Sequence, residues 1–136
     1  MTSIFADTSY WIALLNPRDA LHHKARSVSA KFSSARIITS EMVLVELLNS
    51  FSEADSRSRK AAATLAEALR ATARGNVVAQ TPEQFEAALQ WYKRADDKNW
   101  SITDCASFQI MERDRIRSAF THDKHFSQAG YETLLR

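Results

Sequence analysis

The sequence predicts a single α/β domain built around a mainly parallel β-sheet. Short apolar segments rich in β-branched residues alternate along the chain with longer helical segments, and this alternation is typical of parallel strands joined by helices. The 136 residues include only two Gly and two Pro, so little of the chain is suited to tight turns. A chain of this length fits one domain, residues 1–136, with room for a substantial core.

The first half of the chain predicts two strands and four helices. Asn16-Pro17 ends the first helix and Gly75 ends the fourth, because Pro and Gly interrupt helical structure. The predicted strands are residues 3–6 and 36–39, and the predicted helices are residues 9–15, 20–32, 41–51 and 56–74.

The second half continues the alternation of strands and helices. Pro82 suits the first position of a helix, since the N–H that it lacks would have no helical partner there. The predicted strands are residues 77–79, 116–120 and 131–135, and the predicted helices are residues 82–95, 103–113 and a short turn at 124–129 before Gly130.

Composition and charge are those of an ordinary globular protein. Hydrophobic residues make up 45% of the chain and charged residues 25%. The net charge of +2 permits a nucleic acid as partner without requiring one. The single Cys105 excludes an internal disulfide and favours a reducing compartment. We therefore expect a cytoplasmic protein, with no signal peptide and no apolar run near the roughly 20 residues that span a bilayer.

Two acidic residues follow predicted strands. Asp7 comes directly after the strand 3–6, and Asp123 comes three residues after Phe120. In a parallel sheet both positions lie at the carboxyl edge of the strands, where α/β proteins bind ligands. Each acid also has a structural explanation, because Asp7 is a good N-cap for the next helix and Asp123 is a common turn residue.

Two further acids lie on predicted helices. Glu46 interrupts a helix that is apolar nearly all round, which predicts a largely buried helix. An unpaired buried carboxylate costs several kcal/mol, so Glu46 is either half of a buried ion pair with Arg or a metal ligand. Asp104 lies in the first turn of the helix 103–113, where an acid also stabilises the helix dipole.

Together the four acids predict a metal site. Carboxylate oxygens are preferred ligands of Mg²⁺ and Mn²⁺. Four of them suit two ions, or one ion and a positioned water, and two such ions clamp the oxygens of a phosphodiester displacement. The hydroxyl groups of Thr8, Ser9 and Thr121 are placed to orient that water or the ligands.

The segments around these acids resemble those of the PIN-domain ribonucleases, most closely the VapC-type toxins of bacterial toxin–antitoxin pairs. The resemblance covers the whole chain in order, and its motifs are Ala6-Asp7-Thr8-Ser9, Glu46-Leu47-Leu48-Asn49, Ile102-Thr103-Asp104-Cys105 and Thr121-His122-Asp123-Lys124-His125-Phe126.

The resemblance implies a three-layer α/β/α fold and cleavage of single-stranded RNA that depends on Mg²⁺ or Mn²⁺. It assigns metal binding and catalysis to four acids and a supporting hydroxyl. It also implies a homodimer and a cognate antitoxin as partner. The residues that it assigns to the site are Asp7, Glu46, Asp104, Asp123 and Thr121.

Other polar and aromatic residues have weaker assignments. His122, Lys124 and His125 flank Asp123, so we expect them to contact RNA. Cys105 fits a small core residue better than a nucleophile, because no His pattern supports it. We expect the three Trp residues to pack in the core or at a dimer face: Trp11, Trp91 and Trp100.

Three other functions are compatible with parts of the pattern. A phosphatase with a strand-end Asp nucleophile is disfavoured, because Ser9 stands where such enzymes need a second Asp. A module that binds RNA or a protein without catalysis would use the acids for structure only. A housekeeping RNA-processing nuclease would keep the chemistry and have no antitoxin.

Overall fold

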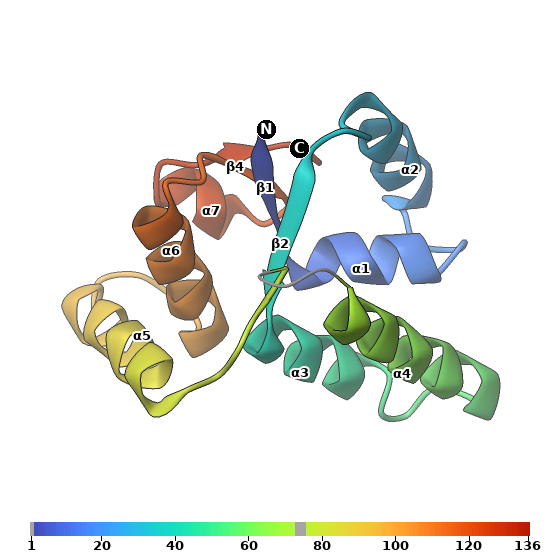
Figure 1. Ribbon diagram of the computed structural model, residues 1–136, viewed down its shortest axis with the longest axis horizontal. Coiled ribbons are helices and arrows are strands. Elements are labelled where there is room, and N and C mark those ends of the chain that lie inside the picture. Colours follow the sequence, from blue (N-terminus) through green and yellow to red (C-terminus); the bar gives the residue numbers. More distant parts are fainter. Residues whose placement is uncertain (1, 73–75) are drawn as a thin grey trace.

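The computed structural model describes residues 2–72 and 76–136 and places a parallel β-sheet between two layers of helices (Figure 1). The strand order is β3-β2-β1-β4-β5, and each strand pairing is parallel. The predicted α/β fold is therefore confirmed. The strands are β1 (Ser3–Ala6), β2 (Arg36–Ser40), β3 (Val77–Val78), β4 (Ser118–Phe120) and β5 (Glu132–Thr133).

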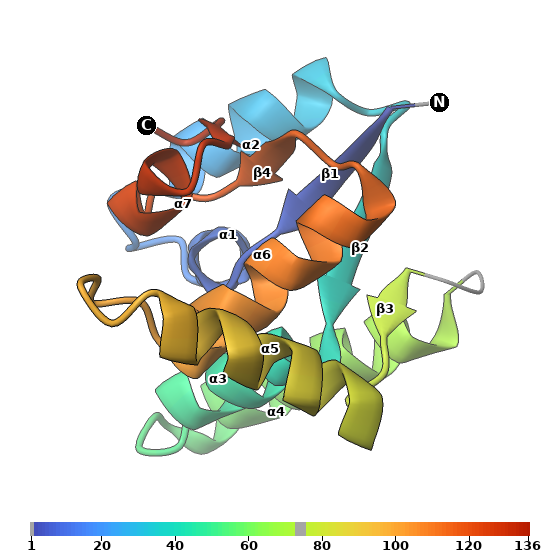
Figure 2. The ribbon, with the colours of Figure 1, turned by 90° about the vertical axis from the view of Figure 1, so that its left-hand side faces the viewer.

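Helices cover both faces of the sheet. The first four helices lie on one side of the strands in Figure 1 and the last three on the other, and Figure 2 shows α5 and α6 in front of the sheet. This is the three-layer α/β/α arrangement that the resemblance implied. The helices are α1 (Thr8–Leu15), α2 (His22–Lys31), α3 (Glu41–Ser50), α4 (Ser56–Ala71), α5 (Pro82–Arg94), α6 (Ile102–Asp114) and α7 (Lys124–Gln128).

Local sequence signals set where several helices begin. Ser40, Asp55 and Thr81 each accept a hydrogen bond from a backbone N–H in the first turn of α3, α4 and α5. These bonds satisfy N–H groups that have no partner within the helix. Pro82 follows Thr81 at the start of α5, as predicted.

Some predicted bounds differ from the structure. Ile116 lies outside β4, because its N–H closes the end of α6 on the carbonyl of Met111 at 2.8 Å. Strand β5 has only two residues, although the N–H groups of Leu134 and Leu135 still donate to carbonyls of Ala119 and Thr121. Helix α4 ends at Ala71, before the predicted end at residue 74, because Thr72 is extended; Gly75, predicted to end the helix, lies outside the described residues.

The order of the strands reverses at β1. The chain forms β2 and β3 on one side of β1, and after α5 and α6 it forms β4 and β5 on the other side. Ligands of α/β proteins bind at such a reversal of strand order. Ala6 pairs with Phe120, and the N–H of Asp7 donates to the carbonyl of Phe120 at 3.1 Å. The residues that follow β1 and β4 are therefore neighbours.

An aromatic cluster packs the last helices against the sheet. The fully buried ring of Phe108 lies with its centroid 4.9 Å from that of Phe126 and 4.9 Å from that of Trp100. Trp91 also contacts Phe108, and Trp11 is buried, so all three Trp residues pack against the core.

Within residues 2–72 and 76–136, no helix has the length and apolar character needed to cross a membrane.

Helix α3 is buried on one face only. Val43 and Leu47 are fully buried, whereas Val45 is 58% exposed and Leu48 is 39% exposed. The predicted burial of this helix therefore holds for one face only, and the prediction that most of the helix is buried is wrong. The apolar sequence reflects a buried face together with an exposed apolar strip, and Glu46 lies half-buried beside that strip.

Candidate metal centre

The predicted site residues meet at the carboxyl edge of β1 and β4. This edge also receives the first residues of α1, α6 and α7 and one side of α3. Side-chain and backbone contacts connect the five predicted residues, some between residues distant in sequence and some between near neighbours. The residues are Asp7, Glu46, Asp104, Thr121 and Asp123.

Asp7 occupies the N-cap position of α1, but its side chain does not cap the helix. Its Oδ2 atom instead accepts a hydrogen bond from the Thr121 hydroxyl at 3.0 Å. Only 5% of Asp7 is exposed, and this burial raises the pKa of its carboxyl group to about 7. The negative charges of Glu46 and Asp104 raise this pKa further. The capping explanation for the Asp7 side chain is therefore wrong.

Thr121 connects Asp7 to the start of α7. Its hydroxyl oxygen accepts the backbone N–H of Asp123 at 3.0 Å while its proton is donated to Asp7. The Ser9 hydroxyl lies 3.4 Å away from that of Thr121. Because Thr121 is fully buried, these bonds fix Asp7 relative to the Asp123 backbone.

Asp104 and Asp123 are brought together by His125. The Nδ1 atom of His125 lies 2.9 Å from Asp104 Oδ2 and 3.3 Å from Asp123 Oδ1. One potential ligand atom from each of these three residues lies within 4.8 Å of the other two. Burial raises the pKa of Asp104, whereas hydrogen bonds from Ser101 and His125 act in the opposite direction.

Glu46 lies next to this cluster through Thr8. The Thr8 hydroxyl donates to Glu46 Oε1, and Thr8 directly follows Asp7 in the chain. Among the residues that the structure describes, no Lys or Arg forms an ion pair with Glu46. The alternative of a buried ion pair for Glu46 is therefore wrong, and its partner is a hydroxyl group at the edge of the site.

The sequence profile of the PIN domain matches residues 4–131 of the chain. The chain belongs to the PIN-domain family. The 23S rRNA-specific endonuclease VapC20 of Mycobacterium tuberculosis is 36% identical over 131 residues, which cover 94% of this chain and 95% of that protein. The predicted resemblance to PIN-domain proteins is therefore confirmed.

Solved structures of related proteins share this fold. The crystal structure of M. tuberculosis VapC20, described as a toxin that cleaves the sarcin–ricin loop, superposes with a TM-score of 0.82 at 33% identity and covers 94% of this chain and 95% of that one. VapBC2 from Rickettsia felis, bound to a promoter DNA fragment, has a TM-score of 0.64 at 13% identity, covering 97% and 96%. FitAcB from Neisseria gonorrhoeae has a TM-score of 0.61 at 16% identity, covering 96% and 95%.

The side chains of this PIN domain fit a divalent cation. Asp104 and Asp123 offer carboxylate oxygens at close range, and Asp7 is a buried carboxylate whose neighbours are also acidic. Mg²⁺ typically binds one or two carboxylates directly and keeps several waters. A cation among these groups would offset both the burial that chiefly raises the pKa of Asp7 and the repulsion from Glu46 and Asp104 that raises it further.

Two neighbours of the predicted ligands have roles that the sequence only partly indicated. We expected His125 to contact RNA, but the structure gives its ring two carboxylate partners. The sequence offered one signal for this role. His125 follows the helix-capping Asp123 by two residues, and this spacing places both side chains near the start of α7. Cys105 is fully buried and its thiol pKa is raised to about 11, chiefly by burial, as expected of a core residue.

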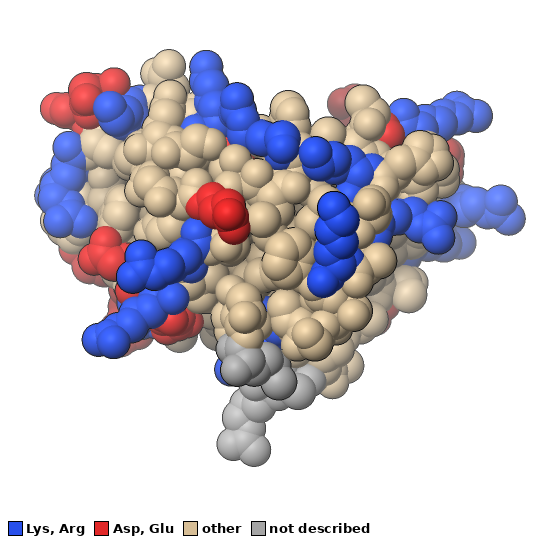
Figure 3. Space-filling view, turned by 90° about the horizontal axis from the view of Figure 1, so that it is seen from above, with Lys and Arg blue, Asp and Glu red and all other residues tan. Residues whose placement is uncertain are grey.

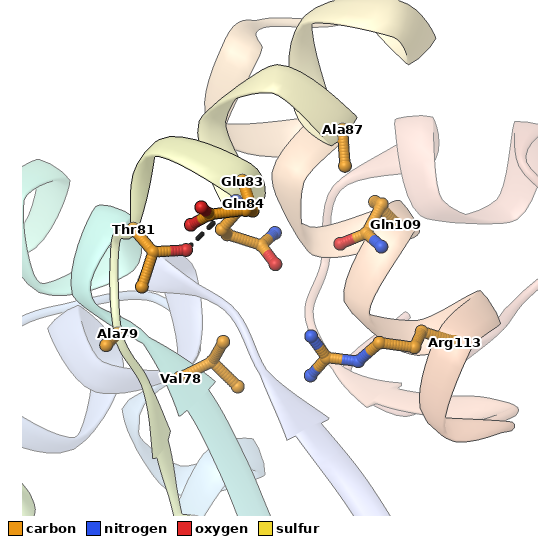
Figure 4. Close-up of a pocket in the computed structure, with 8 residues that line it drawn as sticks. All are labelled: Val78, Ala79, Thr81, Glu83, Gln84, Ala87, Gln109 and Arg113. Atoms are coloured by element: carbon orange, nitrogen blue, oxygen red, sulfur yellow. Dashed lines mark hydrogen bonds between the residues drawn. The ribbon is translucent and has the colours of Figure 1, made fainter.

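A separate pocket of about 330 Å³ lies between the start of α5, the end of α6 and β3 (Figure 4). Gln84 and Gln109 point toward one another across it, and Arg113 extends into it from α6. None of the four acids lines this pocket. The candidate metal centre is therefore distinct from this pocket. The centre is open to solvent at Asp123, whose side chain is 36% exposed.

Proposed function

We propose that this PIN-domain protein is a metal-dependent endoribonuclease that cleaves single-stranded regions of RNA. The observation that carries the proposal is the cluster of Asp104, Asp123 and His125, with ligand atoms within 4.8 Å, beside the buried carboxylate of Asp7. The related M. tuberculosis enzyme, named as an endonuclease, supports the same reaction class.

In this proposal Asp7, Glu46, Asp104 and Asp123 hold Mg²⁺ or Mn²⁺. A bound divalent ion supplies Lewis acidity toward the phosphate and an acidic water for attack. The chain's own contribution is to fix the carboxylates: Thr121 orients Asp7 through its hydroxyl, and Thr8 orients Glu46. These bonds hold the ligands in place before the substrate arrives.

The surface outside the site is suited to a polyanion. When the four site acids are left out, the chain has 18 Lys and Arg residues and 12 acidic residues, which gives a net charge of +6. Figure 3 shows Lys and Arg side chains, with fewer acidic ones among them, over the face that carries α2 and the chain ends, which lies at the amino ends of the strands, opposite the carboxyl edge that holds the site. Contacts from such side chains to phosphates bind RNA without regard to base sequence.

The test is cleavage by the purified protein in buffers of controlled metal content. With Mg²⁺ or Mn²⁺ the wild type should cut single-stranded RNA, and EDTA should stop the reaction. Because VapC20 is named as 23S rRNA-specific, an rRNA stem–loop is the first substrate to use. An Asp123→Asn variant purified in parallel controls for contaminating nuclease. RNA binding with no cleavage under any metal would favour a binding module instead.

We further propose that the protein acts in the cytoplasm as the toxin of a toxin–antitoxin pair and as a homodimer. The description of its M. tuberculosis relative as a toxin supports the toxin part of this proposal. Expression alone in a bacterial host should then arrest growth, and Asp7→Asn should relieve the arrest. Harmless expression of soluble, active wild type would favour a housekeeping nuclease, and light scattering measures the oligomeric state.

A further inference from the structure

His125 lies between two proposed metal ligands that belong to different helices. Asp104 is in the first turn of α6, and Asp123 caps α7, with its Oδ1 accepting the backbone N–H of His125 at 2.9 Å. The Nδ1 atom of the same residue is 2.9 Å from Asp104 Oδ2 and 3.3 Å from Asp123 Oδ1. The His125 ring is thus the direct connection between the two carboxylates.

The chemistry of these contacts identifies Nδ1 as a donor. Ionised carboxylate oxygens only accept hydrogen bonds, so an Nδ1 atom at 2.9 Å from one must carry the proton. Asp104 Oδ2 also accepts the backbone N–H of Ser101 at 3.1 Å, so this oxygen has two donors. No hydrogen bond from a described residue reaches Asp104 Oδ1 or Asp123 Oδ2. One oxygen of each carboxylate is therefore available to a cation.

We propose that His125 is a positioning residue: its Nδ1–H donates to Asp104 Oδ2, its backbone N–H donates to Asp123 Oδ1, and together they hold the two carboxylates so that one oxygen of each is left for the metal. The proposal rests on the proposed function of the site. Two carboxylates at this separation repel each other, and the Nδ1–H group, which donates to Asp104 and lies 3.3 Å from Asp123 Oδ1, offsets that repulsion before the metal binds. Partners of this kind typically change metal affinity by about 10- to 100-fold when removed.

The alternative role for His125 is direct ligation of the metal through Nδ1. In that case Nδ1 would have to be unprotonated, and its lone pair would face the lone pairs of Asp104 Oδ2 at 2.9 Å. Oxygen donors are also preferred over imidazole by Mg²⁺. Direct ligation would overturn the proposal, so the experiment has to separate the two roles.

Two substitutions separate them. His125→Asn places an amide N–H close to the position of Nδ1 and keeps the donor, whereas His125→Leu keeps bulk and removes it. His122→Leu is the matched control, because His122 is an exposed neighbour whose ring forms no hydrogen bond or ion pair with either of these two described acids. The His125 side chain is 21% exposed, and circular dichroism and thermal melting verify that each variant folds.

The measurement is calorimetric titration with Mg²⁺ alone, without RNA. We expect His125→Leu to weaken Mg²⁺ binding by about 10-fold or more, His125→Asn to restore most of the loss, and His122→Leu to bind as wild type. If His125→Leu does not fold, His125→Gln, whose amide lies beyond the Nδ1 position, replaces it and should bind Mg²⁺ more weakly than His125→Asn.

Three results would overturn the proposal. One is unchanged Mg²⁺ affinity in His125→Leu, and another is affinity in His125→Asn as low as in His125→Leu. The third is ¹⁴N coupling from the His125 ring in pulsed EPR spectra of the Mn²⁺-loaded wild type, which would show direct ligation. If the wild type itself neither binds Mg²⁺ nor cleaves RNA, the proposed function fails instead.

Discussion

Asp7 and Asp104 both lie at the start of a helix, but their carboxyl groups have different partners. Asp104 forms a capping box with Ser101 in α6 and also contacts His125. Asp7 stands at the N-cap of α1 without bonding to that helix, and it accepts a hydrogen bond from Thr121 instead. Burial raises the pKa of both groups, and that of Asp7 reaches about 7.

This comparison shows that position at a helix start does not define the role of a carboxylate. Asp104 stabilises the helix on which it lies, so its structural and proposed catalytic roles coexist. Asp7 contributes no such bond, and its buried charge is unfavourable in the absence of metal. A strongly perturbed carboxyl group with acidic neighbours is typical of a functional site.

The largest effect should come from removing either carboxylate charge. We expect Asp7→Asn and Asp104→Asn each to lower the rate of RNA cleavage by about a thousandfold or more, because metal binding supplies several kcal/mol of transition-state stabilisation. RNA affinity should change little, since phosphate contacts outside the site carry it. Single-turnover cleavage and fluorescence anisotropy measure the two quantities. Asp96→Asn, at an exposed acid, is the control, and a fully active Asp7→Asn would remove Asp7 from the site.

The second prediction concerns stability without metal. The pKa of Asp7 is about 7 in the folded protein against 3.8 normally, so the folded state keeps a proton that the unfolded chain has released. The resulting stabilisation is fully present below pH 3.8 and is lost as the pH rises through about 7. As the pH rises from 5 to 8, the wild type should lose stability that Asp7→Asn keeps. The difference in free energy of unfolding between the two proteins should therefore shift in favour of Asp7→Asn by about 3 kcal/mol.

Urea unfolding of both proteins in EDTA at the two pH values measures this difference. The comparison is made between the proteins, because groups distant from Asp7 titrate alike in both. Parallel stability curves for wild type and Asp7→Asn would mean that the buried Asp7 carboxyl group carries no such penalty.

The third prediction concerns stabilisation by metal. At a hundred times its dissociation constant, Mg²⁺ should stabilise the wild type by about 2.7 kcal/mol, because it binds only the folded state. Asp7→Asn and Asp104→Asn should each gain less at the same Mg²⁺ concentration. Calorimetric melting with EDTA and with excess Mg²⁺ measures these gains. Equal gains in all three proteins would place the metal elsewhere.

The smallest effect should come from the cap of α6. Ser101→Ala removes the acceptor for the backbone N–H of Asp104 and should cost about 1 kcal/mol of stability. The cost should be the same with and without Mg²⁺, because Asp104 keeps its carboxylate. Thermal melting in both buffers measures it. A Ser101→Ala variant that loses its response to Mg²⁺ would show that the cap and the metal site are one unit.

The alternation of strands and helices, and the place of each of the four acids along it, could be predicted from local sequence. These features depend on neighbours in the chain: Thr81-Pro82 begins α5, and Asp7 directly follows β1. The carboxyl edge of a parallel sheet then predicts that Asp7 and Asp123 lie near each other, because strand direction alone fixes which ends meet.

Only the tertiary structure decided the partner of each acid. The bond from Thr121 to Asp7 joins residues 114 positions apart, and the contact of His125 with Asp104 joins residues 21 apart. The same holds for burial, since an apolar sequence did not reveal that Val45 lies 58% exposed. Hydrogen-bond partners and exposure depend on which surfaces pack together in the folded chain. Local sequence does not predict which surfaces these are.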